Sequence, residues 1–311
     1  VIKEKHRDQF SLNFLQGGAG TSINMNVNEV LAGRATEILK NKISVHALDH
    51  VNLGQSTNDA VPTAFRILML QKINQYLIEL KKLEKEFGKK SREFWKIIKV
   101  GRTHLQDAVP VRLGQEFKAY QSFVKRDIKR LEEVKNYLRE VNIGATSIGT
   151  GINTSKSYIN NVIADLNKLT GLKLKVAADL IDATQNIDVF VQVSGVIKAS
   201  AIGLSKIMND LRLMASGPRA GLGEIILPEA QKGSSIMPGK VNPVMLEMVN
   251  QIAFRVAGND QTITMVAEAG QFELNVMQPI LMSSLIESVI LLKKGVRLFI
   301  KNALIGLKAN P

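Results

Sequence analysis

Apolar residues recur every three or four positions through the middle and the last third of the chain. This spacing places them on one face of an α-helix. One segment, 188–214, is apolar around most of its circumference, which is typical of a helix inside a bundle or between subunits. The pattern predicts about five long helices, and their ranges are 70–87, 117–138, 188–214, 243–267 and 279–304.

Between these segments we find no alternation of apolar and polar residues of the kind that marks β-strands. We therefore expect an all-α protein built as an elongated bundle of long helices. Short stretches without helical spacing separate the helices, and they are rich in small polar residues. These stretches are 16–22, 54–59, 101–110, 144–155 and 233–243.

Composition narrows the class of protein. Of the 311 residues, 45% are hydrophobic, which is ordinary for a globular chain. The chain has no cysteine and 4 histidines without a His-Glu-x-x-His motif, so we expect neither disulfides nor a metal site. We find no uninterrupted apolar run long enough to span a bilayer and no signal-peptide pattern at the first residues. A cytoplasmic protein without a membrane partner is the expectation.

The formal net charge of +13 raises nucleic acid as a partner. However, lysines alternate with acidic residues on the predicted helix faces, as in 80–94, and aromatic residues make up 5% of the chain. This pattern is typical of a solvated helical surface. We therefore expect no nucleic-acid partner.

The stretch GSSIMPGKVNP, residues 233–243, has the glycines and the lysine of a phosphate-binding loop. The spacing is wrong for a nucleotide P-loop, because five residues separate Gly233 from Gly239 and Val241 stands where a hydroxyl should follow Lys240. The polar loops also offer hydrogen-bond donors just before helices, where free amides attract anions. Taken singly, each such residue is more often a helix cap or a turn.

Four of these stretches together resemble the signature regions of the fumarase/aspartase superfamily, in the order found there. They are QGGAGTSINMNVNEV (16–30), VNLGQSTND (51–59), GRTHLQDAVP (101–110) and GSSIMPGKVNP (233–243). Within the superfamily, segments 140–153, 209–229 and 250–279 are similar to aspartate ammonia-lyases, particularly the Bacillus type. Class II fumarases are the alternative, and His104 does not separate the two.

This resemblance implies a lyase that deaminates L-aspartate to fumarate and ammonia without a cofactor. It implies that Ser234 is the base that takes the Cβ proton, and that an aci-carboxylate forms. Lys240 and Asn242 would bind the α-carboxylate, and Glu247 resembles the carboxylate that orients the histidine. The β-carboxylate pocket would comprise Thr21, Ser56, Thr57 and Ser235, and the amino group would be held by Asn58, Thr103 and His104.

The resemblance also implies a homotetramer around a multi-helix core, with each active site drawn from three subunits. Helices of about 30 residues span roughly 45 Å, too far for the loops of one chain to converge easily. We expect 1–59 to be the last part of an N-terminal domain, 60–311 to form the central bundle, and the family's small C-terminal domain to lie outside this chain. The alternative hypothesis from another functional class is a non-catalytic helical structural protein, but such a protein would have little need for all these motifs.

Overall fold

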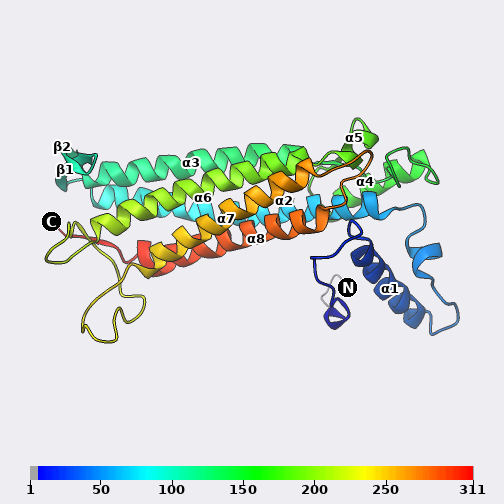
Figure 1. Ribbon diagram of the computed structural model, residues 1–311, viewed down its shortest axis with the longest axis horizontal. Helices are drawn as coiled ribbons and strands as arrows, with labels where there is room; N and C mark the ends of the chain where they lie inside the picture. The colour runs from blue at the N-terminus through cyan, green and yellow to red at the C-terminus, as the bar shows by residue number, and fades with distance from the viewer. Residues whose placement is uncertain (1–5, 311) are drawn as a thin grey trace. The chain divides into compact units, whose positions relative to one another are not determined.

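The computed structural model describes residues 6–310 as long helices joined by loops, with short two-stranded sheets (Figure 1). The all-α bundle predicted from the sequence is therefore confirmed. The helices are α1 (Thr21–Ile38), α2 (Thr57–Glu93), α3 (Leu113–Leu138), α4 (Lys156–Thr170), α5 (Leu180–Gln185), α6 (Asp188–Met214), α7 (Val244–Glu268) and α8 (Gln278–Phe299). The strands are β1 (Ile98–Thr103), β2 (Gln106–Arg112), β3 (Glu140–Val141), β4 (Lys175–Val176), β5 (Ile225–Ile226) and β6 (Lys308–Ala309). Single turns of other helix types occur at Arg7–Gln9, Ala47–Val51 and Ile300–Leu304.

The five helices predicted from periodicity correspond to α2, α3, α6, α7 and α8, and α6 has the predicted bounds at both ends. Helices α1, α4 and α5 were not predicted, although α4 has apolar residues at helical spacing, such as Tyr158, Val162 and Leu166. In α1, Asn28 and Ala32 are the buried residues, so the helix lacks an apolar stripe. A helix without an apolar stripe, such as α1, cannot be predicted from the spacing of apolar residues.

The chain forms two compact units. The described part of the first unit covers 6–71, 135–192 and 261–286, and the second unit covers 72–134, 193–260 and 287–310. The core of the first unit includes Phe65 and Phe190, whose ring centroids lie 5.0 Å apart. Arg66 stacks over Phe190 and donates to the carbonyl of Tyr137 at 3.0 Å, and burial lowers the pKa of its guanidinium to about 10.

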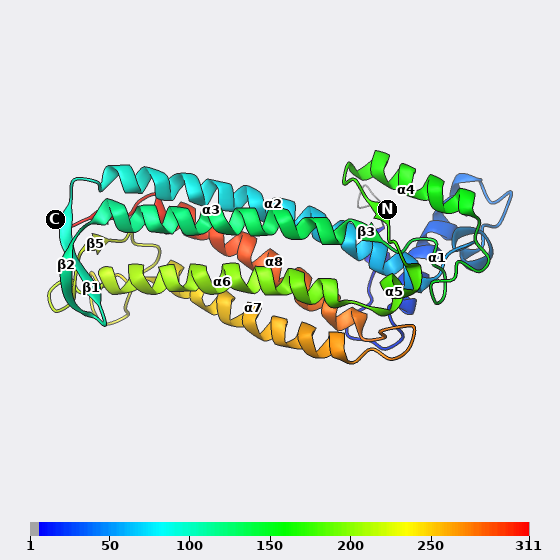
Figure 2. The same cartoon turned by 90° about the horizontal axis from the view of Figure 1, so that it is seen from above.

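In the second unit, α3 and the unit's parts of α2, α6, α7 and α8 run side by side (Figure 2). Rings from three of these helices meet in its core. Phe87 lies 6.2 Å from Phe117, 5.7 Å from Tyr120 and 6.2 Å from Phe299, measured between ring centroids. These rings bury large apolar areas, and aromatic burial contributes strongly to the stability of such a core.

Helix α6 is long and apolar enough, by length and composition, to cross a membrane. A core helix of a bundle passes the same test, and the contacts of α6 are of that kind. Ser194 and Lys198 donate to the carboxylate of Asp260 at 2.7 and 2.5 Å. The hydroxyl of Ser200 lies 2.9 Å from that of Tyr76. Buried polar groups that are satisfied by neighbouring helices mark a packed interior.

Residues 101–110 were expected to form a loop, and this expectation is wrong. They belong to the antiparallel hairpin β1–β2, in which Thr103 pairs with Gln106. The two residues between them, His104 and Leu105, have φ angles of 56° and 61°. Positive φ at both central positions makes a turn whose twist matches that of antiparallel strands. The turn was missed because it has neither glycine nor asparagine at these positions, which are the usual signals.

Candidate active site

Ser234 lies in the loop 233–243, which has no helix or strand. Its Oγ accepts hydrogen bonds from two backbone amides, those of Ile236 at 3.2 Å and Met237 at 3.1 Å. Amide donors that point at an oxygen stabilise negative charge on it. The loop is therefore built to favour a more anionic serine oxygen than a free side chain would have.

The base of the same loop is closed by a short contact. The Nδ2 of Asn242 donates to the carbonyl of Gly233 at 2.6 Å. A Cβ added at Gly233 would lie 1.8 Å from the carbonyl oxygen of Lys240, so only glycine fits there. The two ends of the loop thus approach closely, and Ser235 and Lys240 remain exposed on it.

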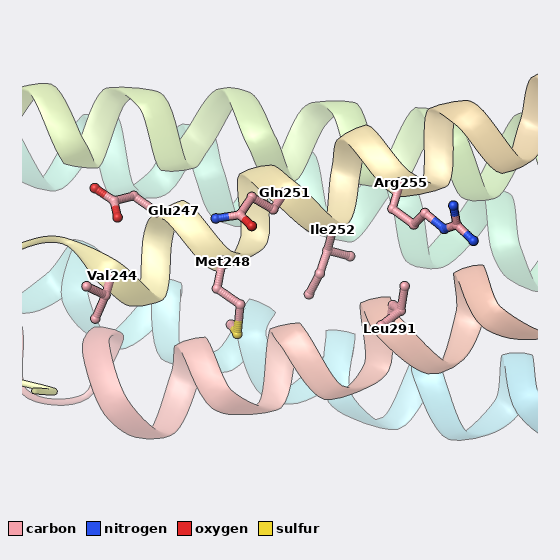
Figure 3. Close-up of a pocket in the computed structure, with 7 residues that line it drawn as sticks. All are labelled: Val244, Glu247, Met248, Gln251, Ile252, Arg255 and Leu291. Carbon is pink, nitrogen blue, oxygen red and sulfur yellow. The ribbon is translucent and has the colours of Figure 1, made fainter.

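Glu247 lies in the first turn of α7, one turn after this loop. Its carboxylate is 4.0 Å from the guanidinium of Arg212. It also lines a surface groove of about 450 Å³, shown in Figure 3, whose other lining residues are Val244, Met248, Gln251, Ile252, Arg255 and Leu291. Within residues 6–310, no hydrogen bond or ion pair joins Glu247 to His104.

Thr103 and His104 lie at the tip of the β1–β2 hairpin, and both are exposed. In the second unit, the hairpin and the loops between α6 and α7 lie at the same end of the helices (Figures 1 and 2). A left-handed backbone is unfavourable for His104 and more so for the bulky Leu105. Such backbone strain persists only where the surroundings hold it.

In the first unit, α2 begins in a capping arrangement. The Oγ of Ser56 accepts from the amide of Asn58 at 3.1 Å, and Asp59 Oδ1 accepts from the amide of Ser56 at 3.0 Å. Reciprocal bonds of this kind satisfy amides that have no partner in the first turn of a helix. Thr57 is the first residue of α2, so Ser56, Thr57 and Asn58 are all fixed at its beginning.

Asn58 is held from two sides. Pro62 has no N–H, so the carbonyl of Asn58 lacks its usual partner within α2. The side chain of Asn142 supplies that partner, with a distance of 3.0 Å between Nδ2 and the carbonyl oxygen. The Asn58 side chain in turn donates to the carbonyl of Ser147 at 2.7 Å. These contacts fix the orientation of an amide that was expected to hold the amino group.

Thr21 is the first residue of α1, and its Oγ1 donates to the carbonyl of Gly18 at 2.7 Å. A Cβ added at the preceding Gly20 would lie 3.3 Å from Cγ1 of Val61. The start of α1 therefore packs against the beginning of α2, one turn after Thr57. The structure brings Thr21 to the same region of the first unit as Ser56, Thr57 and Asn58.

Asp59 is a supporting residue that sequence analysis did not single out. It is fully buried, and its Oδ2 accepts from the amides of Gly144 at 3.1 Å and Thr146 at 3.0 Å. Burial raises the pKa of the Asp59 carboxyl, and these backbone hydrogen bonds oppose the rise. Asp59 thus ties the loop 144–155 to the first turn of α2.

Asp59→Ala is expected to lower the free energy of unfolding by about 3 kcal/mol, because buried amides then lose their acceptor. Denaturant unfolding followed by circular dichroism measures this loss. Asp165→Ala, on an exposed position of α4, is the matched control and should change the free energy by less than about 0.5 kcal/mol. Equal stability of the two variants would contradict the role given to Asp59.

The predicted site residues thus fall into two sets, one in each unit. The first unit holds Thr21, Ser56, Thr57 and Asn58, and the second holds Thr103, His104, Ser234, Ser235, Lys240, Asn242 and Glu247. Among residues 6–310, no group of three or more His, Cys, Asp or Glu side chains is arranged to bind a metal ion.

Comparison with known proteins decides the family. A family model described as a lyase matches residues 1–258, well over half of the chain. The chain belongs to the lyase family.

Similar proteins within this lyase family are named aspartate ammonia-lyase. An aspartate ammonia-lyase of a Bacillus species is 54% identical over 100% of this chain and 67% of its own length. That of Bacillus subtilis (strain 168) is 52% identical over 100% of this chain and 66% of its own length. The resemblance to aspartate ammonia-lyases, Bacillus type included, is confirmed. This lyase chain spans about two thirds of the length of these relatives.

Solved structures agree with the fold. A class II fumarase from Schistosoma mansoni is 36% identical, with a TM-score of 0.96 over 99% of this chain and 68% of that one. A fumarate lyase:delta crystallin from Brucella melitensis, crystallised with bound cobalt, is 47% identical, with a TM-score of 0.96 over 99% of this chain and 68% of that one.

Proposed function

We propose that the protein catalyses the reversible deamination of L-aspartate to fumarate and ammonia, without an organic cofactor. The relatives named aspartate ammonia-lyase support this substrate, since they match the whole chain at 54% and 52% identity. The observation that carries the chemistry is the pair of backbone amides directed at Ser234 Oγ.

The difficult step is removal of a proton from Cβ of aspartate. That carbon is a weak acid, because its ionisation puts a second negative charge on the neighbouring carboxylate. Fixed donors directed at this carboxylate stabilise the dianion as it forms, and such electrostatic stabilisation is usually the largest part of catalysis. In this proposal the donors are the hydroxyls and amides of Thr21, Ser56, Thr57 and Ser235.

Ser234 is the base in this proposal. A serine hydroxyl is a poor base, so its Oγ must be close to an alkoxide when it takes the Cβ proton. The amides of Ile236 and Met237 favour this form, because they donate to the oxygen that carries the charge. The electrons of the C–H bond then form the double bond of fumarate, and the C–N bond breaks to release ammonia.

Two further groups orient the substrate. Lys240 and Asn242 bind the α-carboxylate, and Asn58, Thr103 and His104 hold the amino group that leaves. The exposed loop 233–243 closes over the substrate, which excludes water and strengthens the charge interactions inside the site. Its ligand is therefore a dicarboxylate rather than a phosphate.

The alternative enzyme is a class II fumarase, and the alternative of another class is a helical structural protein. Each predicts a different result when fumarate formation is followed by absorbance. The proposed function requires fumarate from L-aspartate. Fumarate from L-malate alone would favour the fumarase, and no fumarate from either substrate would favour the structural protein.

We also propose that the protein is a homotetramer and that each active site takes residues from three chains. In α6, 44% of the most apolar segment is buried within this chain, which leaves apolar surface for other copies. On α7, the side chain of Phe254 is 67% exposed. Helix α2 has 37 residues and is about 55 Å long. Residues at its two ends are therefore too far apart to contact one substrate molecule, and we assign them to two different active sites.

Subunit complementation tests this assembly. Ser234→Ala and His104→Ala proteins are mixed, dissociated and reassociated. If the serine and the histidine of one site come from different chains, roughly a quarter of the sites in a random mixture contain both residues. We expect activity to recover to about that fraction, while either variant treated alone stays inactive. No recovery, with subunit exchange demonstrated by mass spectrometry, would mean that both residues come from one chain.

A further inference from the structure

Glu224 lies between the loop that follows α6 and strand β5, which leads to the loop of Ser234. Its backbone is fixed on both sides. Its amide donates to the carbonyl of Met214 at 2.9 Å, and its carbonyl accepts from the amide of Asn310 at 3.0 Å. The side chain of Asn310 also donates to the carbonyl of Gly223 at 2.7 Å. Glu224 is therefore held at a defined place in the second unit.

The carboxylate of Glu224 bonds to two cations of the same strand. Its Oε1 accepts from Nη1 of Arg102 at 2.6 Å, and its Oε2 accepts from Nζ of Lys99 at 2.5 Å. The side chain of Glu224 is 15% exposed and that of Lys99 is 10% exposed. Charged hydrogen bonds that are screened little by water are stronger than those on an open surface.

The two cations depend on Glu224 to different degrees. Lys99 also binds Glu116, with Nζ at 3.2 and 3.1 Å from its two carboxylate oxygens. The second acidic partner of Arg102 is Asp107, whose Oδ1 lies 3.8 Å from Nε of Arg102 and whose side chain is 82% exposed. The hydrogen bond that Arg102 donates to Glu224 raises the pKa of the Arg102 guanidinium, as expected for its main partner. Loss of the Glu224 carboxylate would therefore affect Arg102 most.

Arg102 directly precedes Thr103 and the turn in which His104 and Leu105 have left-handed backbones. These conformations are unfavourable for both residues, so surrounding contacts must hold them. The ion pairs of Glu224 with Lys99 and Arg102 are such contacts, because they anchor β1 to a backbone segment that is itself fixed.

We propose that Glu224 is a positioning residue that anchors β1 through Arg102 and Lys99, and so orients Thr103 and His104 toward the amino group of the substrate. The proposal rests on the proposed function for the identity of the substrate. Its structural part, the anchoring of the hairpin, is independent of that function.

Glu224→Gln tests the proposal. The amide of Gln has the size of the carboxylate but places an N–H group against one of the two cations. Glu86→Gln is the matched control, because Glu86 has an exposed fraction of 18%, binds Lys89 at 2.6 Å and, within residues 6–310, forms no hydrogen bond or ion pair with β1 or β2. Two readouts are compared for both variants and the unaltered protein. They are hydrogen exchange of the peptide that covers 98–112, and the KM values of the reverse reaction.

We expect faster exchange of 98–112 in Glu224→Gln and unchanged exchange in Glu86→Gln. In the reverse reaction, the KM for ammonium should rise about tenfold, because the residues that hold the amino group are displaced. The KM for fumarate should stay within about twofold, since other residues bind the carboxylates. A general loss of structure would instead change both KM values.

Failure of the proposed function and failure of the anchoring by Glu224 give different results. If the unaltered protein forms no fumarate from L-aspartate, the proposed function is wrong, and hydrogen exchange still decides whether Glu224 anchors the hairpin. Unchanged exchange of 98–112 in Glu224→Gln would overturn the anchoring. Faster exchange with an unchanged KM for ammonium in an active protein would overturn the role in binding the amino group.

Discussion

Ser234→Ala is expected to lower kcat for L-aspartate by about 10³-fold or more, because in the proposed mechanism Ser234 is the group that takes the Cβ proton. The amides of Ile236 and Met237 then have no side-chain oxygen to bind, and no other described contact supplies a base at this point of the loop. Fumarate absorbance measures kcat, and circular dichroism should show unchanged helix content.

Ser122→Ala is the control for this substitution. Ser122 lies on α3, and its hydroxyl donates to the carbonyl of Lys118 within the same helix at 3.0 Å. Activity of this variant should stay within about twofold of the unaltered protein, as for most surface changes. Near-normal activity of Ser234→Ala would show that the base is another residue.

Lys240→Ala is expected to raise the KM for L-aspartate by about 100-fold with a smaller change in kcat, because in the proposed site Lys240 is the counter-charge of the α-carboxylate. Steady-state kinetics over a wide range of aspartate concentrations separates the two parameters. The lysine is exposed, so its removal leaves no buried charge without a partner and should not affect folding.

Lys232→Ala is the matched control, since Lys232 is an exposed lysine just before the same loop. Its KM should stay within about twofold, because charges on an open surface contribute little. If both lysine variants raise KM equally, the effect is a general attraction of the basic surface for the dianionic substrate. A fall in kcat with constant KM in Lys240→Ala would instead assign the lysine to the chemical step.

Sequence patterns predicted the helices that bury an apolar face. The bounds of α6 were obtained in this way, because its apolar residues end where the helix ends. The pattern did not predict α1, whose contacts are mainly polar, as in the bonds from Asn24 and Asn28 to Asn52 Oδ1 at 3.1 and 2.9 Å. Hydrogen bonds between distant side chains have no period along the sequence.

In the candidate site, too, contacts between residues far apart in the sequence could not be predicted. Motifs pointed to Ser234 and Asn58, but not to the groups that hold them. Asn142 lies 84 positions from Asn58 in the sequence. Its side chain replaces the backbone donor that Pro62 lacks, so that the Asn58 carbonyl has a hydrogen-bond partner. The amides at Ser234 Oγ are backbone groups, so side-chain identity carries no information about them.

The backbone origin of the two donors at Ser234 Oγ determines which amino-acid substitutions the loop tolerates. The two donors at Ser234 belong to the main chain, so every substitution at positions 236 and 237 except proline retains them. The side chains of Ile236 and Met237 are 83% and 48% exposed, so they can be exchanged without disturbing a core. Positions 236 and 237 can therefore vary in sequence while Ser234 Oγ keeps its two amide donors.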